Sequence, residues 1–407
     1  MRYILAALLF TICGPAQGQG FERIVIDDNF PGAYQVEVAD VNGDKKPDVI
    51  AVGGGICAWY ENPSWKKRIV TGPKQTPGVI SSATADIDGD GKAEVAVAYE
   101  FSMNEPTKGK LLLATQGKTI DDPWTVAPIA DFGSIHRLRW SDFLDLDNAI
   151  VIGTNSVRID HDRKVRTLVV APIFGPSAKP PDFQQEPAHV TLFTPDGSIK
   201  RGRWKQRVIG DAPVLHAIDV VDLDGDKVDD FLAASNLGVS RFAFTHDRGT
   251  PVFTPLSLVP GAPGNPPKKG CSEVHVGRLK NGKRFLATVE PWHGTKVAVY
   301  LSESDKPLTF SFGLVIDNSL KEGHALWIAD VDGDGDDEIF AGFRGPGTSV
   351  LMFDFDGKAW NRTVIDNAIA AQDLRGGDLD GDGTPDVVAV GGSTHNVIWY
   401  KPLRRPR

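Results

Sequence analysis

An acidic nine-residue motif recurs along the chain and constrains its fold more than any other feature. The pattern Asp-x-(Asp/Asn)-Gly-Asp-x-x-x-(Asp/Glu) occurs five times, at 40–48, 86–94, 222–230, 330–338 and 378–386. Each copy follows a short alternating run, such as YQVEVAD, and precedes an apolar run, such as VIAVGG. This pattern predicts a strand, an acidic loop and a second strand. Its recurrence indicates a repeat protein.

Two weaker copies fill the gaps, around Asp142 and Arg278, so the number of units becomes seven. A second repeated segment, such as WNRTVIDN at 360–367, is typical of the last strand of a unit. Its first copy, at 21–29, precedes every unit, whereas the last unit has no such strand after it. The N-terminal strand therefore completes the C-terminal unit, which closes a ring without free sheet edges. We predict an all-β, seven-bladed β-propeller with four strands per blade over 21–407; an open solenoid is the alternative.

The first twenty residues, MRYILAALLFTICGPAQGQG, have an early cation, an apolar run and small residues near the end. This pattern predicts a signal peptide over 1–20 and a secreted or periplasmic protein. No other apolar run has the length of a membrane span, so none is expected.

Composition excludes one class of partner and leaves other questions open. The formal net charge of −9 offers no basic stripe for nucleic acid. Beyond the predicted signal the cysteines are Cys57 and Cys271, and both a disulfide and two separate thiols stay open. The oligomeric state is also open.

The acidic loops resemble FG-GAP or VCBS-type repeats, and this resemblance implies a calcium-binding propeller. Alternating carboxylates, a glycine for the turn and a later carboxylate also match the oxygen-rich shell that Ca²⁺ takes. We therefore expect structural calcium ions, several per chain. The expected ligands are Asp40, Asn42, Asp44, Asp48, Asp86, Asp88, Asp90, Glu94, Asp222, Asp224, Asp226, Asp230, Asp330, Asp332, Asp334, Glu338, Asp378, Asp380, Asp382 and Asp386.

Three histidines share one position in the repeat. The residues six positions before the motif are, in blade order, Tyr34, Ile80, His136, His216, Ser272, His324 and Gln372. The innermost strand of each blade lines the axis, so these side chains should ring the mouth opposite the acidic loops. Three imidazoles with room for a further ligand suit a catalytic divalent transition metal, and Zn²⁺ is the expected ion. The alternative is three histidines that form hydrogen bonds in a polar channel.

The loops between the second and third strands should reach the same mouth. They carry Tyr99 and Glu100, Trp292 and His293, Arg344, and His395, while Asp373 adjoins the histidine position. In blade three we expect an insertion over the mouth at 154–187. We predict catalytic roles for His293, Arg344, Glu100, His395 and Asp373. Trp292, Tyr99 and Arg344 are expected to bind substrate.

This set of groups fits β-elimination on a small carbohydrate. A metal can polarise a carbonyl, His293 could remove the adjacent proton, and a nearby acid could assist departure of the β-oxygen. The segments VEPWHGTKVAVY and EGHALWIADVDGDGDDEIFAGFRG resemble the propeller domain of aldos-2-ulose dehydratase. That resemblance implies a metal-dependent lyase that dehydrates keto-sugars, with His293, His324 and Arg344 in its site.

Other functions stay open at this point. A calcium-stabilised propeller that binds carbohydrate or protein without catalysis is the main alternative. A uronide-cleaving polysaccharide lyase and a metal-dependent glycoside hydrolase are further ones, because a metal-bound hydroxide would be available to the same three histidines.

Overall fold

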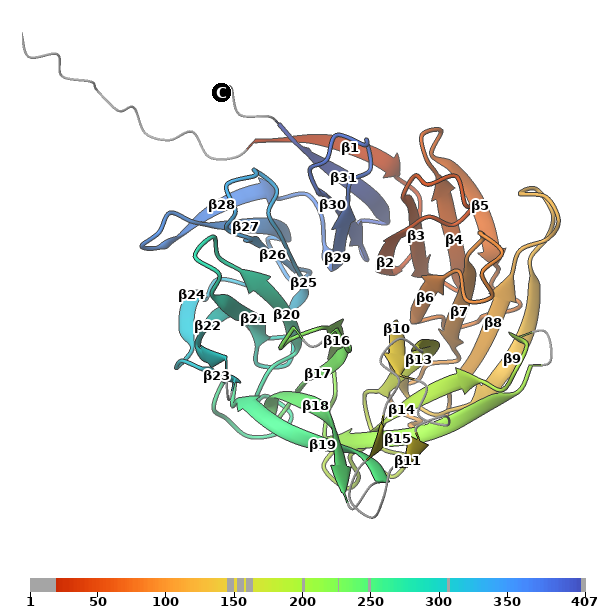
Figure 1. The fold of residues 1–407 in the computed structure, drawn as a ribbon. Helices are drawn as coiled ribbons and strands as arrows, with labels where there is room; N and C mark the ends of the chain where they lie inside the picture. The colour runs from red at the N-terminus through yellow and green to blue at the C-terminus, as the bar shows by residue number, and fades with distance from the viewer. Residues whose placement is uncertain are drawn as a thin grey trace, which may run out of the picture.

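In a computed structural model the protein folds into a ring of seven antiparallel blades, which confirms the predicted propeller (Figure 1). Six blades have four strands, and in the fifth blade two short strands share the outer edge. The structure describes residues 20–144, 150–151, 157–158, 164–199, 202–225, 227–247, 250–305 and 308–403. Except for Gly20, the predicted signal peptide lies outside these residues. No helix with the length and apolar character of a membrane span is found in the described part of the chain.

Each blade runs from an innermost strand at the axis to an outer edge strand, and its strands are named in that order. The first three blades are β2 (Ala33–Ala39), β3 (Asp48–Gly53), β4 (Ile56–Glu61), β5 (Lys66–Thr71); β6 (Ser81–Ala85), β7 (Glu94–Tyr99), β8 (Lys110–Thr115), β9 (Thr125–Asp131); and β10 (Ile135–Leu144), β13 (Lys164–Pro172), β14 (Ala188–Pro195), β15 (Trp204–Ala212). The fourth and fifth are β16 (Ala217–Val221), β17 (Asp230–Ser235), β18 (Gly238–Asp247), β19 (Thr250–Val259); and β20 (Glu273–Arg278), β21 (Arg284–Glu290), β22 (Lys296–Asp305), with β23 (Leu308–Phe310) and β24 (Leu314–Asp317) on one edge. The last two are β25 (Gly323–Ala329), β26 (Glu338–Phe343), β27 (Ser349–Phe355), β28 (Trp360–Asp366); and β29 (Ala371–Gly377), β30 (Asp386–Gly391), β31 (Asn396–Pro402), β1 (Phe21–Asp27).

Apolar side chains of the blades are buried between neighbouring blades around the ring. Ile339 of β26 packs into the cluster shared with blade five, whereas the next residue, Phe340, packs into the cluster shared with blade seven. Successive side chains of a strand point to opposite faces, so a strand covered on both faces must be apolar throughout. This requirement explains the continuous apolar runs that follow each acidic loop.

The N-terminal strand closes the ring as predicted. β1 pairs antiparallel with β31, from Phe21 opposite Pro402 to Ile24 opposite Trp399. The N-terminal strand and the last strands of the chain therefore lie side by side in one blade (Figure 1). This pairing satisfies the outer edge of the last blade, which would otherwise expose unpaired backbone groups.

Asp366 joins the closing strand to blade six. Its Oδ2 accepts hydrogen bonds from Arg23 Nε of β1 at 2.8 Å and from Tyr400 Oη of β31 at 2.7 Å. Replacing Asp366 with alanine leaves the buried Tyr400 hydroxyl without its acceptor, so the free energy of unfolding should fall by about 1–3 kcal/mol. Urea unfolding measures this change. The matched control is Glu22→Ala on the exposed side of β1, and equal destabilisation by both substitutions would contradict this role of Asp366.

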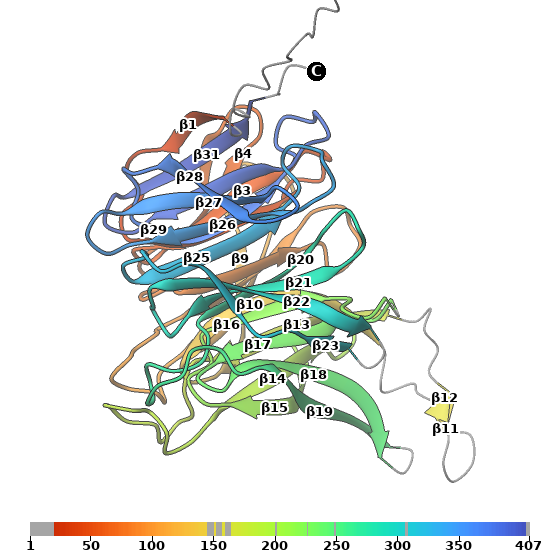
Figure 2. The same cartoon turned by 90° about the vertical axis from the view of Figure 1, so that its left-hand side faces the viewer.

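The predicted insertion in blade three has the wrong boundaries. Residues 164–172 are themselves the second strand, because β13 pairs with β10 from Leu144 opposite Lys164 onward. The extra residues are therefore split between the two faces of the ring. The short hairpin of β11 (Ile150–Val151) and β12 (Val157–Arg158) follows β10 and projects on the acidic-loop side (Figure 2). Only 173–187 connect β13 with β14 at the opposite mouth. Residues 154–156 and 159–163 of the predicted insertion lie outside the described part.

The two cysteines are separate, buried thiols. Cys57 lies in β4 of blade one, and Cys271 precedes β20 of blade five. A disulfide between them is therefore absent from the structure.

Candidate active site

The three histidines of the shared repeat position are buried at the start of their innermost strands. His136 is 2 % exposed, His216 1 % and His324 0 %. Each Nδ1 lies within hydrogen-bond distance of a backbone carbonyl in the next blade: His136 at 2.8 Å from His216 O, His216 at 2.9 Å from Ser272 O, and His324 at 2.6 Å from Gln372 O. These acceptors occupy the same repeat position as the histidines themselves.

The carbonyl contacts determine which ring nitrogen carries the proton. A carbonyl oxygen only accepts, so each of these Nδ1 atoms donates and, in a neutral ring, Nε2 keeps its lone pair. Burial, helped by neighbouring positive charge, lowers the pKa of all three imidazoles and so favours the neutral form. Fixing the tautomer through a second hydrogen bond is the usual arrangement of metal-binding histidines.

His216 has an additional carboxylate partner. Glu273 Oε1 lies 2.9 Å from His216 Nδ1 and 3.5 Å from Arg137 Nη2, and both charged side chains are almost fully buried. Burial opposes ionisation of Glu273, but the hydrogen bond from His216 and the charge of Arg137 lower the pKa of this carboxyl. An ionised Glu273 orients the ring and makes its Nε2 a stronger electron donor.

The Nε2 atoms face a tyrosine and a fourth histidine. Tyr34 Oη lies 2.8 Å from His136 Nε2 and 3.2 Å from His324 Nε2. His293 Nε2 lies 3.1 Å from His216 Nε2. Sequence reasoning placed Tyr34 at the shared position but gave it no role, although that position was the signal that could have identified it.

Arg344 defines the proton position on His293. Its Nη2 donates to His293 Nδ1 at 3.2 Å, its Nη1 to Gln372 Oε1 at 3.0 Å, and its Nε to Glu322 Oε2 at 3.2 Å. A guanidinium only donates, so Nδ1 of His293 accepts and the proton of the neutral ring lies on Nε2. Burial and nearby positive groups lower the pKa of His293, which supports the neutral form. His293 therefore presents an N–H to the centre of the cluster.

In the described part of the chain, one set of three histidines brings its ligand nitrogens close enough together to hold a metal ion, and it differs from the predicted set. Potential ligand nitrogens of His216, His293 and His324 lie within 4.8 Å of one another. The predicted set has His136 in place of His293, and Tyr34 Oη lies between His136 and His324. The hydrogen bonds favour the predicted set, because His136, His216 and His324 have free Nε2 lone pairs while His293 has a proton there. These donors suit zinc.

Other predicted site residues have different partners. Glu100 pairs with Lys110 at 2.9 Å, and Asp373 accepts from Val36 N and pairs with Arg375. His395 is exposed and accepts a hydrogen bond from Gly32 N. Tyr99 packs at the edge of the core between blades one and two. Among the described contacts, no hydrogen bond or ring contact joins these four side chains to the histidine cluster.

An aromatic wall covers one side of the histidines. Trp292, only 8 % exposed, packs edge-on against Phe174 and Phe183, and its ring centroid lies 5.0 Å from that of His293. Phe174 and Phe183 belong to the 173–187 segment, so this part of the predicted insertion does lie at the mouth. Trp292 Nε1 has no hydrogen-bond partner in the described structure. The ring is thus largely buried, and its N–H is buried with it.

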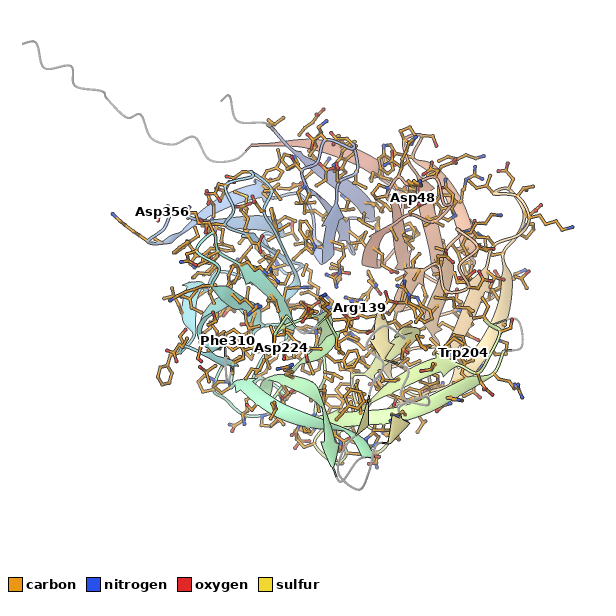
Figure 3. The ribbon with its side chains drawn as sticks, in the orientation of Figure 1. Asp48, Arg139, Trp204, Asp224, Phe310 and Asp356 are labelled. Carbon is orange, nitrogen blue, oxygen red and sulfur yellow. The ribbon has the colours of Figure 1, made fainter. Side chains whose placement is uncertain are left out.

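Charged side chains lie near the axis of the ring, further along the innermost strands than the histidines. The side chain of Arg139 lies beside the axis (Figure 3), and His275 Nδ1 is 3.3 Å from Asp219 Oδ2. Arg375 Nη1 lies 3.5 Å from His275 Nε2 and 3.2 Å from Asp373 Oδ1. Opposite charges therefore largely compensate one another at this depth.

The acidic loops lie on the opposite face and share one internal geometry. The first aspartate accepts from two backbone N–H groups of its loop, as Asp330 does from Gly333 and Gly335. The last carboxylate accepts from the residue after that aspartate, as Glu338 Oε2 does from Val331 N at 2.8 Å. Three loops bring at least three carboxylates together: Asp86, Asp88 and Asp90; Asp330, Asp332 and Glu338; Asp378, Asp380 and Asp386.

The remaining two acidic loops differ from these three. In blade four, Arg241 pairs with Asp230 at 2.7 Å and also contacts Asp224, so a guanidinium already balances part of the charge. Asp226 of this loop lies outside the described residues. In blade one, both oxygens of Asp48 accept backbone hydrogen bonds, from Val41 and Asn62.

Comparison with known proteins agrees with the resemblance inferred from the sequence. Residues 111–303 match the family described as "Aldos-2-ulose dehydratase, beta-propeller domain", and residues 40–97 match the FG-GAP-like repeat. The chain is 24% identical over 374 residues to aldos-2-ulose dehydratase of Phanerodontia chrysosporium. The chain resembles an aldos-2-ulose dehydratase propeller. The alignment covers 82% of this chain and 39% of the relative, so the chain spans well under half of that enzyme's length.

Solved structures of similar shape are more distant. One comes from a study of the recognition of non-reducing terminal N-acetylglucosamine by an Agrocybe aegerita lectin. It aligns with a TM-score of 0.47 at 15% identity and covers 89% of this chain and 86% of that chain. A likeness of this size has no bearing on function.

Proposed function

We propose that this protein is a metal-dependent carbohydrate lyase that removes water from a keto-sugar by β-elimination. The observation that supports it most is the tautomer that His136, His216 and His324 share. The Nδ1 atom of each ring lies against a backbone carbonyl group, which leaves the Nε2 lone pair available to a metal. The resemblance to a dehydratase propeller supports the reaction class, although the identity is low and the relative is much longer. The proposal includes export from the cytoplasm, on the pattern of residues 1–20.

His136, His216 and His324 would hold the metal, with Zn²⁺ as the expected ion. A bound divalent ion supplies Lewis acidity, which polarises a carbonyl and makes the adjacent C–H more acidic. The buried Glu273 and Arg137 keep the His216 ring in one orientation. Tyr34 Oη is positioned to donate a hydrogen bond to a sugar oxygen beside these rings.

His293 is assigned as the proton donor rather than the base. Elimination breaks a C–H bond and a C–O bond, forms a C=C bond, and releases the oxygen as water once it receives a proton. The Nε2–H of His293 can deliver that proton, because Arg344 keeps Nδ1 as an acceptor, and the proton released from the C–H bond restores the neutral ring, so the step balances. The predicted role as base would require Arg344 to release this atom. Arg344 and Gln372, which contact each other, are positioned to bind substrate hydroxyl or carbonyl groups.

The aromatic wall limits access of bulk water to these groups. Trp292, Phe174 and Phe183 pack against one another beside His293. Exclusion of water strengthens each electrostatic interaction with the developing charge and slows competing hydrolysis.

Ultraviolet absorbance from new carbon–carbon unsaturation tests the proposal. The zinc-loaded protein is incubated with 1,5-anhydrofructose and, separately, with a uronide oligosaccharide, and absorbance should rise with the keto-sugar. His293→Gln removes the proton donor and should lower kcat by about 10²–10⁴-fold while leaving bound zinc unchanged. Absorbance only with the uronide would favour the polysaccharide lyase. Binding of sugar without any change in absorbance would favour the non-catalytic propeller.

A further inference from the structure

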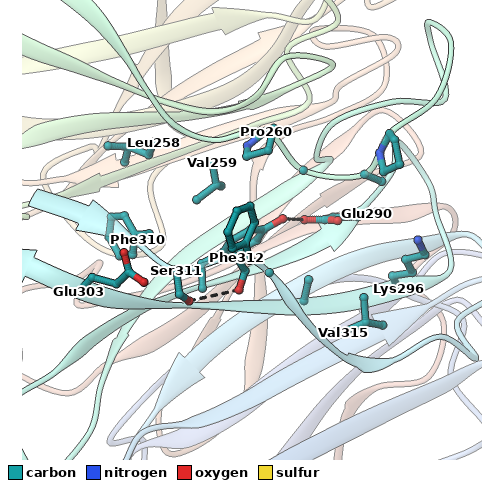
Figure 4. A pocket seen from close by; sticks show the side chains of 16 residues that line it. Leu258, Val259, Pro260, Glu290, Lys296, Glu303, Phe310, Ser311, Phe312 and Val315 are labelled. Carbon is teal, nitrogen blue, oxygen red and sulfur yellow. Dashed lines mark hydrogen bonds between the residues drawn. The ribbon is translucent and has the colours of Figure 1, made fainter.

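A cavity lies between blades four and five (Figure 4), and none of its lining residues is a histidine. Its volume is about 380 Å³, which is within the range of small-molecule sites. One wall comes from residues 258–263 at the end of β19 and after it, and the other from β22 and the interrupted outer strand of blade five. Most of the walls are apolar, with three charged side chains: Glu290, Lys296 and Glu303.

The cavity exists because the outer strand of blade five is broken. β23 pairs with Ser302–Asp305 of β22 and β24 pairs with Val297–Val299, while 311–313 leave the sheet between them. Tyr300 fills the position opposite the break, where a Cβ on Gly313 would lie only 2.7 Å from its ring. Phe312, at the outermost point of the break, is 98 % exposed. A single exposed apolar side chain is ordinary on a protein surface, so Phe312 matters here because it also lines the cavity.

A buried carboxylate reaches this cavity. Glu290 is 3 % exposed and is the last residue of β21, three residues before His293. Its Oε1 lies near three donors: Tyr300 Oη at 2.6 Å, Thr288 Oγ1 at 2.8 Å and Cys271 Sγ at 3.5 Å. Its second oxygen, Oε2, receives no hydrogen bond from any described residue. A carboxylate in apolar surroundings is expensive to bury unless a cation or donor compensates it.

Lys296 does not supply that compensation. It lines the same cavity, yet no ion pair joins it to Glu290 in the described structure, and Figure 4 shows its ammonium group apart from the carboxylate. Two carboxyl side chains and one lysine line the cavity, so acidic groups outnumber basic ones. This excess therefore favours a cation over an anion.

We propose that this cavity binds a small organic ammonium ion with an apolar or aromatic body. The ammonium group donates to Glu290 Oε2, and the body packs against Val259, Pro260 and the ring of Phe312. Tyr300, Phe310 and Phe312 add aromatic groups that attract cations. A sugar is a poorer match, because Ser311 Oγ is already bonded to the backbone of Leu301 and Phe312, and most other walls lack polar side chains.

Calorimetric titration of the full chain with benzylamine, which is protonated at neutral pH, tests the proposal. Benzyl alcohol has nearly the same shape without the charge and should bind about 10-fold more weakly, or weaker still. Glu290→Gln keeps the side-chain shape and should weaken benzylamine binding by about 10-fold, with little effect on benzyl alcohol. Lys296→Ala removes a like charge and should strengthen benzylamine binding.

Control variants separate this site from the histidine cluster and from folding defects. Phe312→Ser changes a fully exposed side chain, so it should fold normally and bind benzylamine several-fold more weakly. His324→Ala should bind benzylamine as the wild type does, which excludes coordination of the amine to a metal at the histidines. Equal binding of benzylamine and benzyl alcohol, or unchanged affinity in both Glu290→Gln and Lys296→Ala, would overturn the proposal. Tighter binding of glucose than of benzylamine would overturn it as well.

Discussion

Replacing His324 with alanine is expected to remove the transition metal and to lower lyase activity by more than about 100-fold. Loss of a supporting residue outside the metal shell typically costs 10–100-fold in metal affinity or activity, and loss of a ligand should exceed that. His324 is fully buried, and its Nδ1 is held by Gln372 O at 2.6 Å, so the substitution removes a ligand whose ring has a fixed orientation. Elemental analysis of dialysed protein gives the zinc content, and the absorbance assay gives the activity.

Two variants make this result specific. Glu273→Gln keeps the ligands but replaces the carboxylate beside His216 Nδ1, so zinc affinity should fall by about 10–100-fold while saturating zinc restores much of the activity. His395→Ala changes an exposed histidine that accepts from Gly32 N and should leave zinc content unaltered. If His324→Ala still holds one zinc per chain with wild-type activity, the proposed metal site is wrong.

The fold could be predicted because every blade needs the same order of residue types. The inner strand needs alternating apolar and polar residues, the tight turn after it needs acidic residues, and the second strand needs apolar residues because both of its faces are covered. The closing strand was predictable for the same reason, since Phe21–Asp27 repeats a segment that the last blade lacks. Blade three departs from this order, and there the prediction failed. The apolar run at 149–154 has the sequence pattern of a second strand. In the structure, however, β10 extends to Leu144 and pairs with 164–172.

The candidate site was only partly accessible to sequence reasoning. The shared position in the repeat predicted that His136, His216 and His324 are neighbours, because equivalent residues of the innermost strands lie around one axis. It could not give the direction of side chains on the loops. Glu100 and His395 therefore looked equivalent to His293 in sequence, although their contacts are with Lys110 and Gly32. Nor could it show that Arg344 donates to Nδ1 of His293, the contact on which the proposed role of His293 as an acid depends.

Removing calcium is expected to lower the midpoint of thermal unfolding by about 10 °C. An ion present at 100 times its dissociation constant stabilises the folded state by about 2.7 kcal/mol, so three loops that each hold calcium would contribute about 8 kcal/mol. The unfolding entropy of about 2 cal/mol/K per residue converts this, for a chain of this length, into about 10 °C. The three loops are those that gather carboxylates around Asp86, Asp330 and Asp378. Scanning calorimetry with excess calcium and with a chelator measures the difference.

The pH dependence of the chelated protein provides the sharper test. Burial, with the charges of Asp332, Asp354 and Asp330, raises the pKa of Glu338 to about 9, and its Oε1 has no partner in the described structure. A carboxyl whose folded pKa exceeds its unfolded value binds more protons when folded, so stability should fall as pH rises from about 4.5 toward 9. Calcium favours the ionised form and should remove this slope. Glu338→Gln, which is neutral at every pH, should reduce the slope of the chelated protein and weaken calcium binding at that loop. A chelated protein that is equally stable at pH 5 and pH 8, with the same midpoint as in calcium, would show that these loops need no ion.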